Sequence, residues 1–284
     1  MKSRVEGRTP SRDGLSLFWR GRLAERPRAA LVLVHGLCEH SGRYARPLGY
    51  FGEDYACYAV DLRGHGLSAG PRGHVDGFDA YLDDVEAVLG VARQAHPGLA
   101  AFVIGHSMGG LVALLMGLLR PAVGLAGVIA NAPALRTHPA LAPHPAVQAL
   151  ARLAAPLLPR LRRPTVIEPT LLTRDPEVIA AYASDPLVSR HVSLRWFTSY
   201  NEAQRQAWAE VSRLRIPSLV MASGEDRLVD SAAVADWAAR APEGLVSAVR
   251  WPGLYHEAFN EPEQERVFER VRAFVEERLA ARQT

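Results

Sequence analysis

The stretch AFVIGHSMGG, at positions 101–110, constrains the fold of this chain more than any other part of the sequence. Apolar residues of strand character precede Gly-His-Ser-Met-Gly, and an apolar segment of helical length follows to position 119. A serine on such a strand-turn-helix junction is lifted clear of the sheet, and the residues two before and two after it must be small. Gly105 and Gly109 meet that requirement. The pattern predicts a nucleophile at Ser107, with an ordinary glycine-rich loop as the alternative.

Apolar runs alternate with segments of helical periodicity along most of the chain. Continuous apolar strands separated by helices are typical of an α/β fold with a mostly parallel, doubly wound sheet, which binds ligands at the carboxyl ends of its strands. Strands are expected at 14–22, 29–34, 56–60, 101–104, 124–130, 216–223 and 245–250. Helices are expected at 44–54, 79–94, 110–119, 231–240 and 263–281.

One segment breaks this alternation. From Asn131 onward, prolines repeatedly interrupt an Ala- and Leu-rich stretch, and the strand-helix rhythm resumes only near position 216. We therefore expect residues 132–208 to form a cap inserted into a core made of residues 1–131 and 209–284. The hydrophobic content of 48% in 284 residues suits a single large core with such an insertion better than two domains.

Composition and charge exclude several classes of protein. The net charge is +3, but the basic residues are dispersed and form no stripe with interleaved aromatics, so no nucleic-acid partner is expected. Cys38 and Cys57 are too few for a disulfide scaffold and are expected to be free thiols. The N-terminus has no apolar signal core, and no apolar run reaches the length of a membrane span. We expect a cytoplasmic protein.

A serine nucleophile needs a histidine as base and a carboxylate that orients the histidine. His256 follows the last predicted strand, and the chain order Ser, acid, His is the one that this architecture uses. The loop after strand 216–223 offers Glu225, Asp226 and Asp230. Asp230 suits an N-cap of the next helix, and Asp226 lies nearer the strand end. We therefore assign Asp226 as the acid, with Glu225 as its competitor.

An oxyanion needs two hydrogen-bond donors. The Met108 amide at the start of the helix is one candidate. The second is the Leu37 amide, because it follows His35-Gly36 at the end of an early strand, where glycine lets the backbone come close. The alternative is that His35-Gly36 only makes a tight turn.

Several longer segments resemble the monoacylglycerol lipase and lysophospholipase branch of the α/β-hydrolase superfamily. They are HGLCEHSGRY from 35, DLRGHGLSAGPRGHVDGF from 61, GHSMGG from 105, TRDPEVIAAYASDPLV from 173, GEDRLVD from 224 and YHEAFNE from 255. The resemblance implies Ser107, Asp226 and His256 as the catalytic triad, and Leu37 and Met108 as oxyanion donors. It also implies that the insertion is a mobile cap that forms an acyl channel.

Two positions depart from the pattern of this family. Cys38 stands where relatives usually have a small residue, so one hypothesis is that bulky thiol reagents slow the enzyme, and the alternative is a small buried side chain. Phe259, a further candidate substrate-binding residue, lies three residues after His256, where some relatives have a polar residue that helps to hold the glycerol head. This departure bears on the preference for glycerol esters and not on esterase chemistry.

Three further features bear on substrate and membrane. Glu39 and Arg43 are candidates to contact the alcohol end of the substrate, or alternatively form an ion pair that holds their loop. In the cap, arginines alternate with leucines between positions 152 and 163, so the cap can contact a lipid surface transiently, although prolines break any single amphipathic helix there.

The sequence thus predicts a serine hydrolase of single-chain lipid esters, with monoacylglycerol as the preferred substrate, acting through an acyl-enzyme. No cofactor and no metal are expected. A lysophospholipase or a general carboxylesterase is the nearby alternative. More distant alternatives are a peptidase acting at an N-terminal residue and a non-catalytic ligand-binding protein of the same fold.

Overall fold

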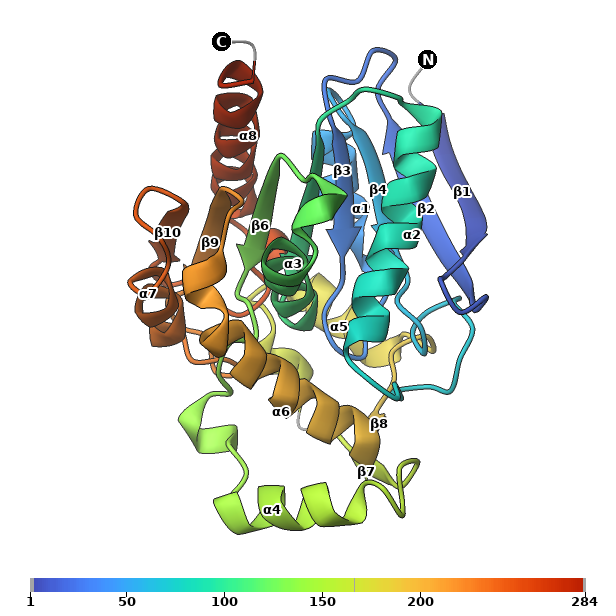
Figure 1. Cartoon of the computed structure of the whole chain (residues 1–284), viewed down its shortest axis with the longest axis vertical. Coiled ribbons are helices and arrows are strands. Elements are labelled where there is room, and N and C mark those ends of the chain that lie inside the picture. Colours follow the sequence, from blue (N-terminus) through green and yellow to red (C-terminus); the bar gives the residue numbers. More distant parts are fainter. Residues whose placement is uncertain (1–2, 166, 283–284) are drawn as a thin grey trace.

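The computed structural model describes residues 3–165 and 167–282. Within them an eight-stranded sheet has the strand order β1-β2-β4-β3-β5-β6-β9-β10 (Figure 1). β2 pairs antiparallel with both β1 and β4, and every other neighbouring pair in this sheet is parallel. The strands are β1 (Ser3–Pro10), β2 (Ser16–Leu23), β3 (Ala30–Val34), β4 (Ala56–Val60), β5 (Ala101–His106), β6 (Gly127–Asn131), β9 (Ser218–Ser223) and β10 (Val246–Trp251).

Helices cover both faces of the sheet and bury its alternating side chains. α1 (Ala45–Phe51) and α8 (Gln264–Ala280) pack on the face that receives Leu31 and Leu33 of β3. α2 (Asp79–Ala95), α3 (Met108–Leu119) and α7 (Ala232–Ala238) pack on the face that receives Val32. This two-sided burial explains the continuous apolar strands and confirms the predicted α/β fold.

The chain between β6 and β9 forms a separate layer beyond the carboxyl ends of the parallel strands, at the opposite end of the molecule from both termini (Figure 1). Its elements are α4 (Pro145–Ala154), β7 (Arg162–Pro164), α5 (Pro176–Ser184), β8 (His191–Ser193) and α6 (Leu194–Ala209). β7 and β8 form a small antiparallel pair. The loops that follow the parallel strands all begin at this edge of the sheet, so this layer covers them.

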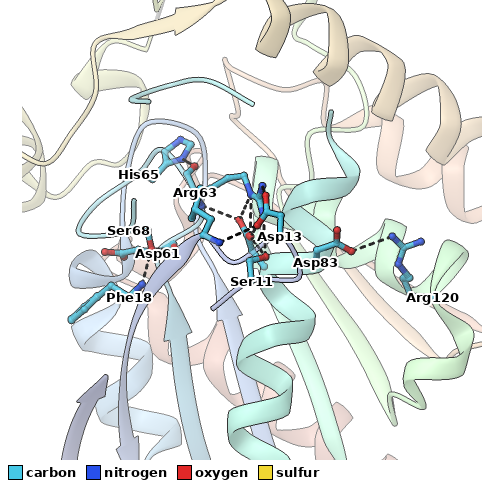
Figure 2. A network of polar contacts seen from close by, with 11 residues as sticks. Ser11, Asp13, Phe18, Asp61, Arg63, His65, Ser68, Asp83 and Arg120 are labelled. Carbon is cyan, nitrogen blue, oxygen red and sulfur yellow. Dashed lines mark hydrogen bonds and ion pairs between the residues drawn. The ribbon is translucent and has the colours of Figure 1, made fainter. Parts of the chain in front are cut away.

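A polar network fixes the loop that follows β4 against α2 (Figure 2). The Arg63 guanidinium forms ion pairs with Asp84 of α2 at 2.7 Å and with Asp13 at 2.7 Å. It also donates to the Ser11 hydroxyl at 2.9 Å. Burial raises the pKa of Asp84, and Arg63 opposes that shift. The network therefore joins the β1–β2 connection, the loop after β4 and α2 into one support.

Asp61, at the end of β4, ties this support to the loop that follows β3. Its two carboxylate oxygens accept the amides of Ser41 and Leu67, each at 2.7 Å. Ser68 continues the chain of bonds, since its hydroxyl accepts the Phe18 amide of β2 (Figure 2). The loop after β3 is therefore fixed by a hydrogen bond to Asp61, a residue far from it in sequence.

The expected strands and helices are present with shifted ends, and in the eight-stranded sheet one strand, β1, was not expected. β1 pairs along its whole length with β2 at the edge of the sheet. Apart from Pro10, Val5 is its only aliphatic residue, so its sequence shows no hydrophobic pattern typical of a strand. In the part of the chain that the structure describes, no helix is both long and apolar enough to span a membrane.

Candidate active site

Ser107 lies on the sharp turn between β5 and α3, with φ 53° and ψ −116°. Non-glycine residues rarely adopt such a conformation, and it costs about 1–3 kcal/mol. Close packing enforces it: a Cβ atom on Gly105 would lie 2.0 Å from the Gly109 carbonyl oxygen, and one on Gly109 would lie 2.2 Å from that of Val34. The Ser107 amide also donates to the Asn131 carbonyl at 3.0 Å. The turn therefore has the strained geometry expected for an exposed nucleophile.

His256 and Asp226 form a buried pair at the ends of two neighbouring strands. Asp226 follows β9 and His256 follows β10, and the His256 Nδ1 atom lies 2.7 Å from Asp226 Oδ2. A carboxylate only accepts, so Nδ1 carries the proton and Nε2 is left as a proton acceptor. The other oxygen of Asp226 accepts the amides of Leu228 at 2.8 Å and Val229 at 3.0 Å. These bonds fix the carboxylate in one orientation.

Each member of this pair stabilises the charged form of the other. Burial alone would raise the pKa of Asp226, but His256 and the two amides hold it below its ordinary value. Burial likewise disfavours the imidazolium, yet Asp226 raises the pKa of His256 above its ordinary value of 6.5. Asp226 therefore favours exactly the cation that forms when His256 accepts a proton. Of the competing acids, Glu225 is exposed, and Asp230 bonds the Ala232 amide at 3.0 Å.

The loop after β3 lies against Ser107. A Cβ atom on Gly36 would lie 3.3 Å from Ser107 Cβ. The Gly36 amide is already bonded to Glu39 Oε1 at 2.6 Å, which leaves Leu37 as the next amide in the loop. The Met108 amide lies in the first turn of α3, where amides have no partner within the helix. Both amides thus belong to backbone that borders the predicted nucleophile.

A cavity of about 260 Å³ joins these residues, and Ser107, His256, Leu37 and Met108 all line it. Its walls are mostly apolar where the segment between β6 and β9 covers it. That part of the lining includes Leu141, Val147, Ile167, Leu172, Val192, Trp196 and Phe197. The cavity therefore has a reactive end at the sheet and an apolar end in the overlying layer, which suits a ligand with a hydrocarbon chain.

A buried ion-pair cluster borders the reactive end. Arg43 donates to Glu39 Oε2 at 2.5 Å and, with two nitrogens, to both carboxylate oxygens of Glu257 at 2.6 and 2.8 Å. Arg43, which is itself buried, lowers the pKa of Glu257 to about 2 against the effect of burial. Glu39, Arg43 and Glu257 all line the cavity. The expected ion pair between Glu39 and Arg43 is present, and it includes a third member.

That third member, Glu257, was given no role from the sequence, although it directly follows His256. Its only sequence signal was its place beside His256, and in the structure Asn260 also donates to its carboxylate at 2.8 Å. The candidate substrate-binding residue Phe259 lies outside the 260 Å³ cavity. It is buried in the core on the α8 face, 5.7 Å from the ring of Phe268. We therefore leave Phe259 out of the substrate-binding residues.

Residues 3–165 and 167–282 contain no group of three or more His, Cys, Asp or Glu side chains arranged to hold a metal ion.

Comparison with known proteins identifies the family. The family model Hydrolase_4, described as serine aminopeptidase, S33, matches residues 25–263 of this chain. The chain belongs to this family. The match runs from before β3 to the residue before α8 and includes every predicted site residue, and the resemblance to α/β-hydrolases is confirmed.

Relatives in this family include two curated proteins. The chain is 34% identical over 256 residues to phospholipase YtpA of Bacillus subtilis, covering 89% of this chain and 97% of that protein. It is also 34% identical over 255 residues to a monoacylglycerol lipase of Mycolicibacterium smegmatis, covering 88% of each. Among solved structures, the monoacylglycerol lipase of Paleococcus ferrophilus matches with a TM-score of 0.80 and 28% identity over 99% of both chains.

Cys38, the departure from the family pattern, has a left-handed backbone with φ 66° and is fully buried. Its carbonyl accepts the Ser189 amide at 2.9 Å, which joins the loop after β3 to the layer above it. Burial raises the pKa of the Cys38 thiol to about 12, so almost no thiolate is present at pH 7. The structure thus favours the small buried side chain over the reactive thiol.

We accordingly expect the native enzyme to resist thiol reagents. Cys38 and Cys57 are both buried and free, and burial raises the pKa of each. Titration with a chromogenic disulfide at pH 7 should modify neither thiol while activity stays constant, and both should react once guanidinium unfolds the chain. Rapid modification of Cys38 in the folded protein, with loss of activity, would restore the reactive-thiol hypothesis.

Proposed function

We propose that this chain hydrolyses carboxylic esters of single-chain lipids, with monoacylglycerol as the preferred substrate. The observation that carries the proposal is one cavity that joins the strained Ser107 and the Asp226–His256 pair to an apolar channel. The relatives named phospholipase and monoacylglycerol lipase support a lipid ester as the substrate.

In the proposed mechanism, Ser107 Oγ attacks the ester carbonyl while His256 Nε2 accepts the serine proton. The Leu37 and Met108 amides donate to the oxyanion, and Asp226 stabilises the imidazolium. The imidazolium then protonates the leaving alcohol, which departs and leaves an acyl-enzyme. Water, deprotonated by His256, attacks this ester, and the fatty acid is released from a regenerated Ser107.

We further propose that residues 132–208 act as the cap and the remaining residues as the catalytic core. Two contacts at the ends of α5 support an anchored second half of the cap: an ion pair between Arg46 of α1 and Asp175 at 2.8 Å, and a hydrogen bond between His40, in the loop after β3, and Asp185 at 2.8 Å. The first half, with α4, packs on α6 through the small residues Ala151 and Ala155. The acyl chain would lie between these two halves and the core.

The head-group preference follows from the charges beside Ser107. Arg43 is paired with both Glu39 and Glu257, so this cluster carries one net negative charge and has no unpaired cation to offer a phosphate. A neutral glycerol can accept and donate hydrogen bonds there, whereas an anionic head group would be repelled. This favours monoacylglycerol over an anionic lysophospholipid, and the likeness to a phospholipase makes lysophospholipids the second candidate substrate.

A substrate panel tests the proposal. Monoacylglycerols, lysophosphatidate, lysophosphatidylcholine and p-nitrophenyl esters of graded chain length are compared by kcat/KM, with Ser107→Ala as the blank. We expect the highest value for a monoacylglycerol. A higher value for either lysophospholipid would make the second candidate the function. A fluorophosphonate probe that fails to label Ser107 would instead point to a non-catalytic ligand-binding protein.

We also propose that the cap contacts a lipid surface through α4 and the loop after it. Leu153 and Leu157 are 75% and 82% exposed, and Leu150, Leu158 and Leu161 are exposed beside them. Exposed arginines are interleaved with these leucines at positions 152, 160, 162 and 163. Apolar side chains flanked by cations suit insertion at an anionic membrane surface, and the cavity beneath would then receive substrate from the lipid.

Replacing Arg152, Arg160 and Arg162 together by serine should weaken binding to phosphatidylglycerol vesicles. Each arginine near such a surface contributes about 1 kcal/mol, so the triple variant should bind about 10²-fold more weakly. Co-sedimentation measures this, with phosphatidylcholine vesicles as the uncharged reference. The matched control, Arg26→Ser with Arg282→Ser, removes exposed arginines at the other end of the molecule and should change little. Equal losses in both variants would contradict a role for the cap.

A further inference from the structure

The side chain of His35 is buried behind the loop that carries Leu37, and it makes two hydrogen bonds to backbone. The Leu62 amide lies 3.0 Å from His35 Nε2, and His35 Nδ1 lies 2.7 Å from the Gly36 carbonyl oxygen. An amide N–H can only donate, so Nε2 accepts and is unprotonated. The proton is therefore on Nδ1, which donates to the Gly36 carbonyl.

This second bond determines where the Leu37 amide points. The Gly36 carbonyl and the Leu37 N–H belong to one planar peptide unit, and in a trans peptide they point in opposite directions. Gly36 borders Ser107 on one side, and both Gly36 and Leu37 line the cavity. With the carbonyl held on His35, away from the cavity, the Leu37 N–H faces the space beside Ser107. Rotation of this peptide would aim the carbonyl oxygen at the oxyanion instead.

We propose that His35 is a positioning residue, which sets the Gly36–Leu37 peptide in the orientation that stabilises the oxyanion. The inference rests on the proposed function, because it assumes that Leu37 is an oxyanion donor. His35 does not line the cavity and touches no substrate atom. It acts through one peptide unit, as a neutral imidazole with its proton on Nδ1.

The surroundings of His35 keep the ring neutral. Burial lowers the pKa of His35 to about 4, although Asp61 opposes this shift. The ring of His65 packs against it at 5.1 Å between centroids, and burial lowers the pKa of His65 to about 3. An imidazolium would have no acceptor for the Leu62 amide, so neutrality at pH 7 is required for both bonds. Asp61 in turn holds Ser41 of the same loop, which limits how far the loop can shift.

A matched pair of variants separates the two bonds of His35. In His35→Asn the amide nitrogen lies near the position of Nδ1 and can still donate to Gly36. In His35→Gln the amide oxygen reaches the position of Nε2 and accepts from Leu62, but the Gly36 carbonyl loses its partner. Each variant leaves one backbone group unpaired, so the two should lose similar stability.

Their effects on catalysis should differ. His35→Gln should lower kcat on a monoacylglycerol by about 10²-fold, as expected for loss of an oxyanion donor, with KM changed less than about threefold. It should weaken binding of a trifluoromethyl ketone analogue, which forms an oxyanion on Ser107, by a similar factor, and leave binding of a neutral long-chain alcohol unchanged. His35→Asn should keep kcat within about tenfold of the native value. Melting temperatures of both variants identify any difference that comes from folding.

Three results would overturn the proposal: native kcat in His35→Gln, equal losses of kcat in the two variants, or a proton on Nε2. The last is measured on the native enzyme by 15N NMR of labelled histidine, with the His35 signal assigned from its loss in His35→Asn, so it decides even if His35→Gln does not fold. Failure of the proposed function looks different. The native enzyme would then lack ester hydrolysis, or Ser107→Ala would retain it, whatever the state of His35.

Discussion

Replacing Ser107 by alanine is expected to lower kcat by about 10⁶-fold, the loss found when the serine of a comparable triad is removed. The substitution removes the nucleophile, because Ser107 carries the only hydroxyl on the turn between β5 and α3. The fold should be unchanged, since alanine keeps the same backbone and the Ser107 amide keeps its bond to Asn131. Hydrolysis of a monoacylglycerol and labelling by a fluorophosphonate measure the loss.

A second substitution at the same position controls for the strain. Ser107→Gly also removes the hydroxyl, but glycine adopts φ 53° without steric cost, so its free energy of unfolding should exceed that of Ser107→Ala by about 1 kcal/mol. Both variants should be equally inactive. If either retains most of the native activity, Ser107 is not the nucleophile, and if Ser107→Gly is no more stable than Ser107→Ala, the turn stores no strain.

The sequence carries enough information for the layers of the fold and the loops of the site. Buried parallel strands such as β3 are continuous apolar runs, and each ends in a loop that reaches the same edge of the sheet. That regularity is why Ser107, Asp226 and His256, far apart in the chain, could be predicted to meet. β1 escaped prediction for the opposite reason. It lies at the sheet edge with mostly exposed side chains, and its half-buried positions are Val5, Gly7 and Thr9, so its alternating burial leaves no hydrophobic pattern in the sequence.

Contacts between distant charged groups could not be predicted in the same way. The residue types of Glu39, Arg43 and Glu257 are compatible with exposed positions, and only the fold brings them together beneath the cap. The same holds for Phe259, since one residue in a short loop can face either the cavity or the α8 side of the sheet. His35 was treated as part of a turn because one of its two bonds depends on where Leu62 lies, which only the fold determines.

Replacing Asp226 by asparagine is expected to change which ring nitrogen of His256 carries the proton. In Asp226→Asn, the amides of Leu228 and Val229 still need an acceptor, so they hold the new side-chain oxygen where Oδ1 lies now. The amide NH₂ group then faces His256 Nδ1, which must become the acceptor. The ring proton moves to Nε2, on the side of Ser107, and His256 can no longer take the proton of the serine.

Asp226→Asn should therefore lower kcat by about 10⁴-fold, the loss seen when this change fixes the wrong tautomer in a serine protease. The pH profile adds a signed test. Asp226 raises the pKa of His256 above 6.5, so native kcat/KM should increase with pH through that raised value as the imidazolium loses its proton. Without the carboxylate this limb should move to lower pH.

The matched control is Asp230→Asn, which removes a charge from the same loop. This substitution only weakens the bonds to Arg136 and to the Ala232 amide, so the variant should keep nearly native kcat. Similar losses in the two variants would mean that the loop charge, and not the orientation of His256, sustains catalysis.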